Sequence, residues 1–157
     1  MANLDECVVA TKLALPMSKG PNMRGLSRKH IQQACEASLR RLGIDTIDLY
    51  QLHRLDPDTP MEETLGALDD LVRQGKVRHI GASSMYAWEM ATALGLSDLP
   101  GLPRLATPHN HYNLLYRHED REVIPLCTTP EVAVISWSPL SLARLPGSRP
   151  SPRSVFA

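Results

Sequence analysis

The chain has 157 residues, of which 43% are hydrophobic and 22% charged, and its 17 basic and 17 acidic residues give a formal net charge of zero. This is the composition of an ordinary folded domain, and it gives no electrostatic case for nucleic acid or an anionic membrane as a partner. No window approaches the ~20 apolar residues of a membrane span, and the first residues lack the basic and apolar regions of a secretion signal, so we expect a cytoplasmic location.

The three cysteines, Cys7, Cys35 and Cys127, are an odd number without a C-x-x-C spacing. We interpret them as free thiols, because neither a disulfide framework nor a thiolate metal site is built from such a set.

Short β-branched runs alternate with helical patterns along the first half of the chain. The run CVVAT at 7–11 predicts a strand, and after a loop a helix is expected over 27–42, ending at Gly43 in a left-handed conformation. The run TIDLYQL at 46–52 predicts a buried strand.

The next helix has the strongest local start signal. Thr59 is expected as its N-cap, Pro60 as its first residue and Glu62 as the reciprocal member of a capping box. The helix is expected to end before Gly75, and KVRHIGA at 76–82 then predicts a third strand.

The pattern repeats twice more. A helix near 86–95 leads to the strand PRLAT at 103–107, and a helix near 118–128, kinked or late because of Pro125, leads to the strand EVAVISW at 131–137.

Strands that alternate with helices at about 30-residue intervals predict a parallel sheet. A doubly wound sheet and a closed barrel both stay open at this point, although no G-x-G-x-x-G follows a strand, which disfavours a dinucleotide-binding doubly wound fold. The glycines of GPNMRGLS at 20–27 have the spacing of a phosphate loop, but Leu26 stands where the lysine is needed, so we interpret the segment as a flexible loop.

A polar or aromatic residue follows or ends each predicted strand. In a (β/α)₈ barrel the carboxyl ends of the strands converge on one pocket, so these positions are candidates for a shared site. They are Lys12, His53, Ser83 with Ser84, His109 with Asn110, and Trp137 with Ser138.

The same segments resemble the aldo-keto reductase family. The motifs VVATK, DLYQLHR, GKVRHIGASS, NHYNLLYR and SWSPL occur in the order and spacing of that family, and residues 53–90 further resemble its bacterial branch. The resemblance implies an α/β protein with a (β/α)₈ TIM barrel, of which about five of eight units are present. We expect residues 1–143 to form this partial barrel and the Pro/Ser/Arg-rich residues 144–157 to be disordered.

The resemblance also implies an activity, the reduction of a small-molecule aldehyde or ketone to an alcohol by hydride transfer from NADPH, with NADH not excluded. Lys12 matches the family lysine that lowers the pKa of a catalytic tyrosine. His53 matches the histidine that orients the carbonyl oxygen of the substrate.

Further residues match positions that contact the cofactor. Ser83 matches a residue that hydrogen-bonds the nicotinamide carboxamide, and Ser84 stands at the next cofactor position, where many members have asparagine. Trp137 matches an aromatic ring that stacks on the nicotinamide. Ser138 and Leu140 match the turn that holds the pyrophosphate. His109 and Asn110 stand where most relatives have Gln-Asn. His109 and His111 have no third ligand nearby in the sequence, so we expect no metal.

Two elements of the family pattern have no counterpart in this sequence. The catalytic aspartate and tyrosine belong to a strand and loop that would precede residue 1, so we expect the isolated chain to be inactive, a product truncated from an oxidoreductase. A non-catalytic cofactor-binding or interaction module is the alternative, disfavoured because the terminal strands are as apolar as buried ones. A five-unit barrel would leave two open sheet edges, which we expect to promote self-association.

Overall fold

The computed structural model describes residues 4–99, 101–128 and 132–147. The elements within these residues follow one another as a repeated strand–helix unit. In chain order they are η1 (Leu4–Glu6), β1 (Ala10–Leu13), α1 (Arg28–Leu42), β2 (Ile47–Leu52), α2 (Met61–Arg73), β3 (Val77–Ser83), α3 (Ala87–Ser97), β4 (Leu105–His111), η2 (His118–Asp120), α4 (Val123–Thr128) and β5 (Ile135–Trp137).

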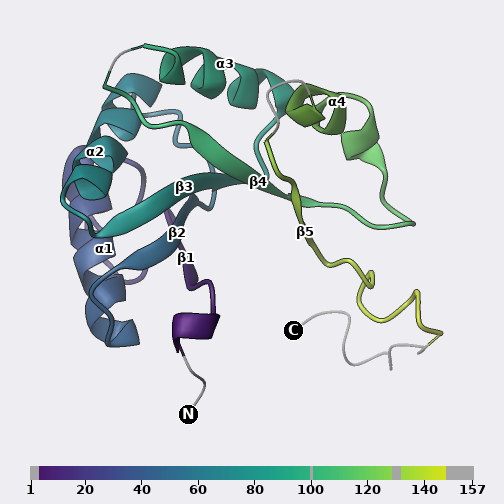
Figure 1. Ribbon diagram of the computed structural model, residues 1–157, viewed down its shortest axis with the longest axis horizontal. Helices are drawn as coiled ribbons and strands as arrows, with labels where there is room; N and C mark the ends of the chain where they lie inside the picture. Colours follow the sequence, from purple (N-terminus) through teal and green to yellow (C-terminus); the bar gives the residue numbers. More distant parts are fainter. Residues whose placement is uncertain (1–3, 100, 129–131, 148–157) are drawn as a thin grey trace.

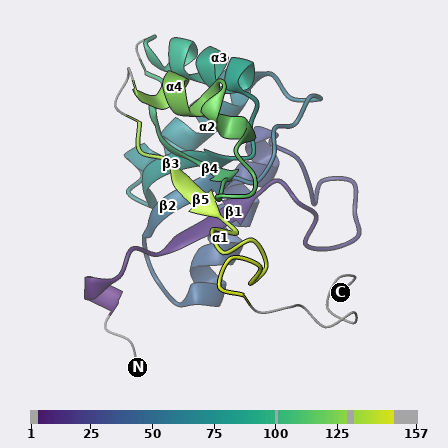
Figure 2. The same ribbon diagram turned by 90° about the vertical axis from the view of Figure 1, so that its right-hand side faces the viewer.

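The strands form one parallel sheet in the order β1-β2-β3-β4-β5. The sheet curls, and the helices lie along its outer, convex side, as the two views in Figures 1 and 2 show. A doubly wound sheet has helices on both faces, so this arrangement is a half-barrel, and the predicted partial (β/α)₈ barrel is confirmed.

The hydrophobic core fills the space between the convex face and the helices. Tyr50, Ile80 and Leu105 are neighbours in the sheet register, and each is at most 1% exposed. Side chains alternate between the faces of a strand, so the next row, which contains Lys12 and Gln51, belongs to the concave face. Burial of the convex face therefore fixes which side chains point into the barrel.

Gly81 allows β3 and β4 to approach closely on the concave side. A Cβ atom at this position would lie 2.8 Å from the backbone oxygen of Thr107 and 3.3 Å from Cγ of Gln51. The register between the two strands shifts between Ile80 and Gly81. Glycine is thus required here by space rather than by backbone conformation.

The predicted ends of the first helix are confirmed. The Ser27 side chain accepts a hydrogen bond from the N–H of His30, and Gly43 ends α1 with φ of 66°. The predicted capping box of α2 is wrong, because Pro60 is the N-cap residue and has no side-chain hydrogen bond to offer. The hydroxyl of Thr59 instead donates to Asp56 Oδ2 at 2.8 Å.

Several predicted strand boundaries are also wrong. The first strand begins at Ala10, and Val8 is 78% exposed, so the apolar run at 7–11 is not a buried strand. The fourth strand extends to His111 instead of ending at 107, which places His109 within the sheet.

The predicted helix at 118–128 is divided into η2 and α4, with Pro125 in the first turn of α4. Proline is tolerated in a first turn because no intrahelical partner is required there. The predicted disordered tail lies largely outside the described residues, since only 144–147 of it are described, as turns. Within the described ranges no helix has the length and hydrophobicity to cross a membrane.

Candidate active site

Three side chains, from β1, the end of β2 and β4, lie within electrostatic reach of one another at the concave face. Lys12 lies on β1, His53 directly follows β2, and His109 lies on β4. Burial and the nearby charges of Lys12 and Arg54 lower the pKa of His53. Burial, Lys12 and His53 likewise lower the pKa of His109. Both imidazoles are therefore neutral at pH 7, and the two rings and the ammonium are within electrostatic reach of one another.

The sheet register explains this convergence. His109 is paired with Ser83 on β3, and His53 lies two residues beyond Gln51, which is paired with Lys12. Positions two apart on a strand share a face, so all of these residues belong to the concave side.

Two buried polar atoms on this face have no hydrogen-bond partner among the described residues. They are Nε2 of Gln51, whose side chain is 3% exposed, and Nδ1 of His109. A buried amide or imidazole nitrogen without a partner carries a desolvation cost.

The turn after β3 is held by neighbouring strands. Ser83 donates from its hydroxyl to the carbonyl of His109 at 2.9 Å. Ser84 has φ of 54°, its N–H donates to Asn110 Oδ1 at 3.0 Å, and its carbonyl accepts from Arg54 Nη1 at 3.3 Å. A left-handed conformation is unfavourable for serine, so these hydrogen bonds stabilise the turn.

Asn110 is 1% exposed and its amide is engaged within the chain. Besides accepting from Ser84, it donates from Nδ2 to Glu119 Oε2 at 3.1 Å and to the Met85 carbonyl at 3.4 Å. Both donor hydrogens are used, so Asn110 can make its predicted contact to a cofactor only by accepting a hydrogen bond at the remaining lone pair of Oδ1.

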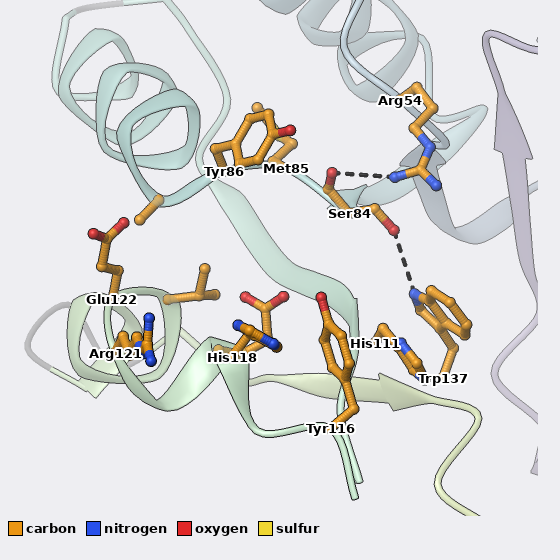
Figure 3. Close-up of a pocket in the computed structure, with 13 residues that line it drawn as sticks. Arg54, Ser84, Met85, Tyr86, His111, Tyr116, His118, Arg121, Glu122 and Trp137 are labelled. Carbon is orange, nitrogen blue, oxygen red and sulfur yellow. Dashed lines mark hydrogen bonds between the residues drawn. The ribbon is translucent and has the colours of Figure 1, made fainter. Parts of the chain in front are cut away.

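Trp137 lies in a pocket of about 560 Å³ at the carboxyl ends of β3, β4 and β5. Its indole N–H donates to Ser84 Oγ at 3.3 Å. The ring of His111 stacks on Trp137, and Tyr116 stacks on the other side of His111, as Figure 3 shows. His118 also lines this pocket.

Sequence reasoning did not give His111, Tyr116 or His118 a role in a site. The period-2 spacing of His109 and His111 does place them on one face. From the sequence alone this spacing suggests only a metal-binding pair, because the ring partners of His111 are distant in sequence. Within the described ranges no three His, Cys, Asp or Glu side chains are grouped as metal ligands.

The turn after β5 has the second strained serine of the site. Ser138 has φ of 53°, and its carbonyl accepts from Asn113 Nδ2 at 3.0 Å. Leu140, also predicted to belong to this turn, is 58% exposed. The structure thus brings Ser84, Trp137 and Ser138 to one end of the sheet, the same end at which β1 and β2 present Lys12 and His53.

Comparison with known proteins identifies the same family. The Aldo/keto reductase family model matches residues 1–156. Similar proteins include an aldo-keto reductase of Fusarium vanettenii, 48% identical over 85% of this chain and 36% of that protein, and an aldo-keto reductase of Alternaria alternata, 49% identical over 85% and 38%. Versiconal hemiacetal acetate reductase of Aspergillus parasiticus is 47% identical over 79% of this chain and 36% of its own length.

The chain thus spans little more than a third of the length of these relatives. All three are fungal, and the resemblance to a bacterial branch stays a prediction. The match over nearly the whole chain and the half-barrel with its helices on one side agree, and the chain belongs to the aldo/keto reductase family.

Proposed function

We propose that the natural polypeptide containing these residues reduces an aldehyde or ketone to an alcohol with NADPH, NADH being the second candidate donor. The observation that carries the proposal is the convergence of Lys12, His53 and His109 on the concave face of a chain of this family. The substrate class is a small-molecule carbonyl compound.

Lys12 and His53 act on the carbonyl oxygen in this proposal. The neutral imidazole of His53, whose pKa is lowered, keeps one N–H that donates to the oxygen and fixes its position. The ammonium of Lys12 favours the negative charge that develops on the oxygen, and on a proton-donating group beside it, as reduction proceeds.

The residues at the strand ends fit a nicotinamide cofactor. When bound, the reduced nicotinamide supplies the hydride for the carbonyl carbon. Ser83 and Asn110 retain acceptor lone pairs for a carboxamide, Ser84 and His109 lie beside them, and the indole of Trp137 offers a flat surface for the ring. We propose that the backbone at Ser138 and Leu140 holds the pyrophosphate.

The proton donor is assigned neither to Tyr50 nor to Tyr112. Burial raises the pKa of Tyr50, which belongs to the convex-face core, and the hydrogen bond to Asp120 raises the pKa of Tyr112. A general acid at neutral pH needs the opposite shift. We propose that the 157 residues alone reduce carbonyl compounds about 10²- to 10⁴-fold more slowly than a protein that has a positioned acid.

The test is a rate assay on the natural polypeptide and, separately, on the 157-residue chain. NADPH oxidation is followed with a panel of aliphatic and aromatic aldehydes, for the parent and for Lys12→Met and His53→Ala. Turnover by the natural polypeptide that both substitutions abolish supports the proposal. NADPH binding without turnover supports the non-catalytic alternative instead.

The sheet edges support a second, smaller proposal, that the 157-residue chain associates with itself. β1 and β5 are the outer strands of the described sheet, and Ile135 on β5 is 40% exposed. Unpaired parallel edges with apolar side chains favour pairing with another chain. Sedimentation at two protein concentrations tests this, and a monomer at both contradicts it.

A further inference from the structure

A stack of rings joins the turn after β4 to the end of β5. The centroids of His111 and Trp137 are 4.1 Å apart with planes 11° apart, and those of His111 and Tyr116 are 4.2 Å apart at 21°. His111 thus lies between the two larger rings and covers one face of the indole, as Figure 3 shows.

Asn113 selects the tautomer of the His111 ring. Its Oδ1 accepts from the N–H groups of Leu115 and Tyr116, both at 2.9 Å, so a flipped amide would place Nδ2 against two donors. The Nδ2 group therefore faces His111 Nε2 at 3.2 Å and the Ser138 carbonyl at 3.0 Å. Because Nδ2 only donates, His111 Nε2 must accept, and the ring proton lies on Nδ1.

The strand that carries Trp137 has little support of its own. β5 has three residues and pairs with β4 alone in the described sheet. Ser138, the next residue, holds a left-handed backbone that is unfavourable in a non-glycine residue. The side chains of His111 and Asn113 therefore provide contacts that the short β-ladder does not.

We propose that His111 and Asn113 are positioning residues, which set the orientation of the Trp137 indole and the backbone of Ser138. The inference rests on the proposed function, in which Trp137 and Ser138 contact the cofactor. Because His111 occupies one face of the indole, a planar ligand ring stacks on the opposite face. The Asn113 amide couples that ring position to the turn proposed for the pyrophosphate.

The test is made on the natural polypeptide with Trp88→Phe. Trp88 is 65% exposed, and its removal leaves Trp137 as the one tryptophan among these 157 residues. Near-ultraviolet circular dichroism reports the indole environment, and NADPH titration gives the dissociation constant. Three variants are compared. His111→Ala removes the ring, and His111→Phe keeps a ring without the Nε2 acceptor. Asn113→Asp keeps the oxygen that accepts from Leu115 and Tyr116 but removes the Nδ2 donor.

His111→Ala is expected to lose most of the Trp137 dichroism and to weaken NADPH binding about fivefold, the scale of one lost ring pair. His111→Phe should retain the dichroism of Trp137, and its dissociation constant for NADPH should lie within about twofold of that of the parent, since the stack remains. Asn113→Asp should weaken NADPH binding, because a carboxylate oxygen would face the Ser138 carbonyl.

Unchanged dichroism in His111→Ala overturns the inference, whatever the activity. Altered dichroism with unchanged NADPH affinity also overturns it, because the orientation of the Trp137 indole would then have no effect on cofactor binding. A parent protein that binds no NADPH contradicts the proposed function, while the dichroism of Trp137 still reports on the contact with His111.

Discussion

Lys12 on β1 and His109 on β4 are separated by two intervening strands, yet they lie within electrostatic reach across the concave face, where burial and, after it, the charge of Lys12 lower the pKa of His109. The curl of the sheet accounts for this reach between strands that do not pair with each other.

Removing the Lys12 charge is expected to raise the pKa of both His53 and His109. The change is Lys12→Met, which keeps the length of the side chain, with Lys29→Met on the exposed surface of α1 as its control. NMR titration of the imidazole protons measures both values. Unaltered titration of both rings in Lys12→Met would show that Lys12 points away from the concave face.

The lowered histidine pKa values predict how stability depends on pH. Below pH ~6.5 the unfolded chain binds protons at His53 and His109 that the folded chain does not yet bind. The free energy of unfolding should therefore fall as the pH drops from about 6.5 toward the lowered pKa values. His109→Gln should make this fall shallower, as measured by urea unfolding across that range.

The exposed His79→Gln serves as the matched control for the histidine replacement. If the free energy of unfolding of His109→Gln fell with decreasing pH as steeply as that of the parent, His109 would be protonated equally readily in the folded and unfolded chain.

Gly81→Ala is expected to destabilise the fold by about 1–3 kcal/mol, the usual cost of overpacking. The new Cβ would lie 2.8 Å from the backbone oxygen of Thr107, so β3 and β4 would have to move apart. Gly95→Ala is the control, because nothing lies within 4 Å of its Cβ position in α3. There alanine should stabilise by about 0.5–1 kcal/mol. Equal effects in thermal unfolding would contradict the close approach at Gly81.

Asp56 joins the loop after β1 to the loop after β2, at the same end of the sheet as the site. Its carboxylate accepts from the Leu26 N–H and the Thr59 hydroxyl, both at 2.8 Å, and from the Asp58 N–H at 3.1 Å. Asp56→Ala should destabilise by about 1–3 kcal/mol, because the Leu26 N–H loses its partner. Asp58→Ala, at an exposed neighbour, should have little effect in the same unfolding assay.

Asp56 also makes the stability of the fold depend on pH in the acid range. Partial burial raises its pKa, but the hydrogen bonds from Leu26, Thr59 and Asp58 outweigh this and the pKa is lowered overall. The contribution of Asp56 to stability is therefore present above pH ~4 and is lost as the pH falls through the lowered pKa. The acid unfolding curve of Asp56→Ala should accordingly be flatter than that of the parent.

Local chemistry in the sequence predicted some features of the fold well. Ser27 and Gly43 bound α1 because each makes its capping interaction within a few residues. Thr59 was assigned wrongly, because Asp56, three residues earlier, accepts its hydroxyl and Pro60 takes the cap position. A competing partner of this kind is not visible from spacing alone.

The candidate site was predictable where a strand ends in a polar residue. The extension of β4 through His111 was missed, since Pro108 reads as a strand breaker, although it stands in the register beside Ala82. The roles of His111 and Asn113 depend on Trp137 and Ser138, about 25 residues away, and only the folded sheet brings them together.

The measurement that tests the central claim most directly is the transfer of deuterium from NADPH deuterated at the reactive nicotinamide carbon to an aldehyde, using the natural polypeptide. The account predicts deuterium on the alcohol carbon of the product, lost in Lys12→Met and His53→Ala. A folded parent that binds NADPH and transfers no deuterium to any aldehyde or ketone of the panel would contradict it.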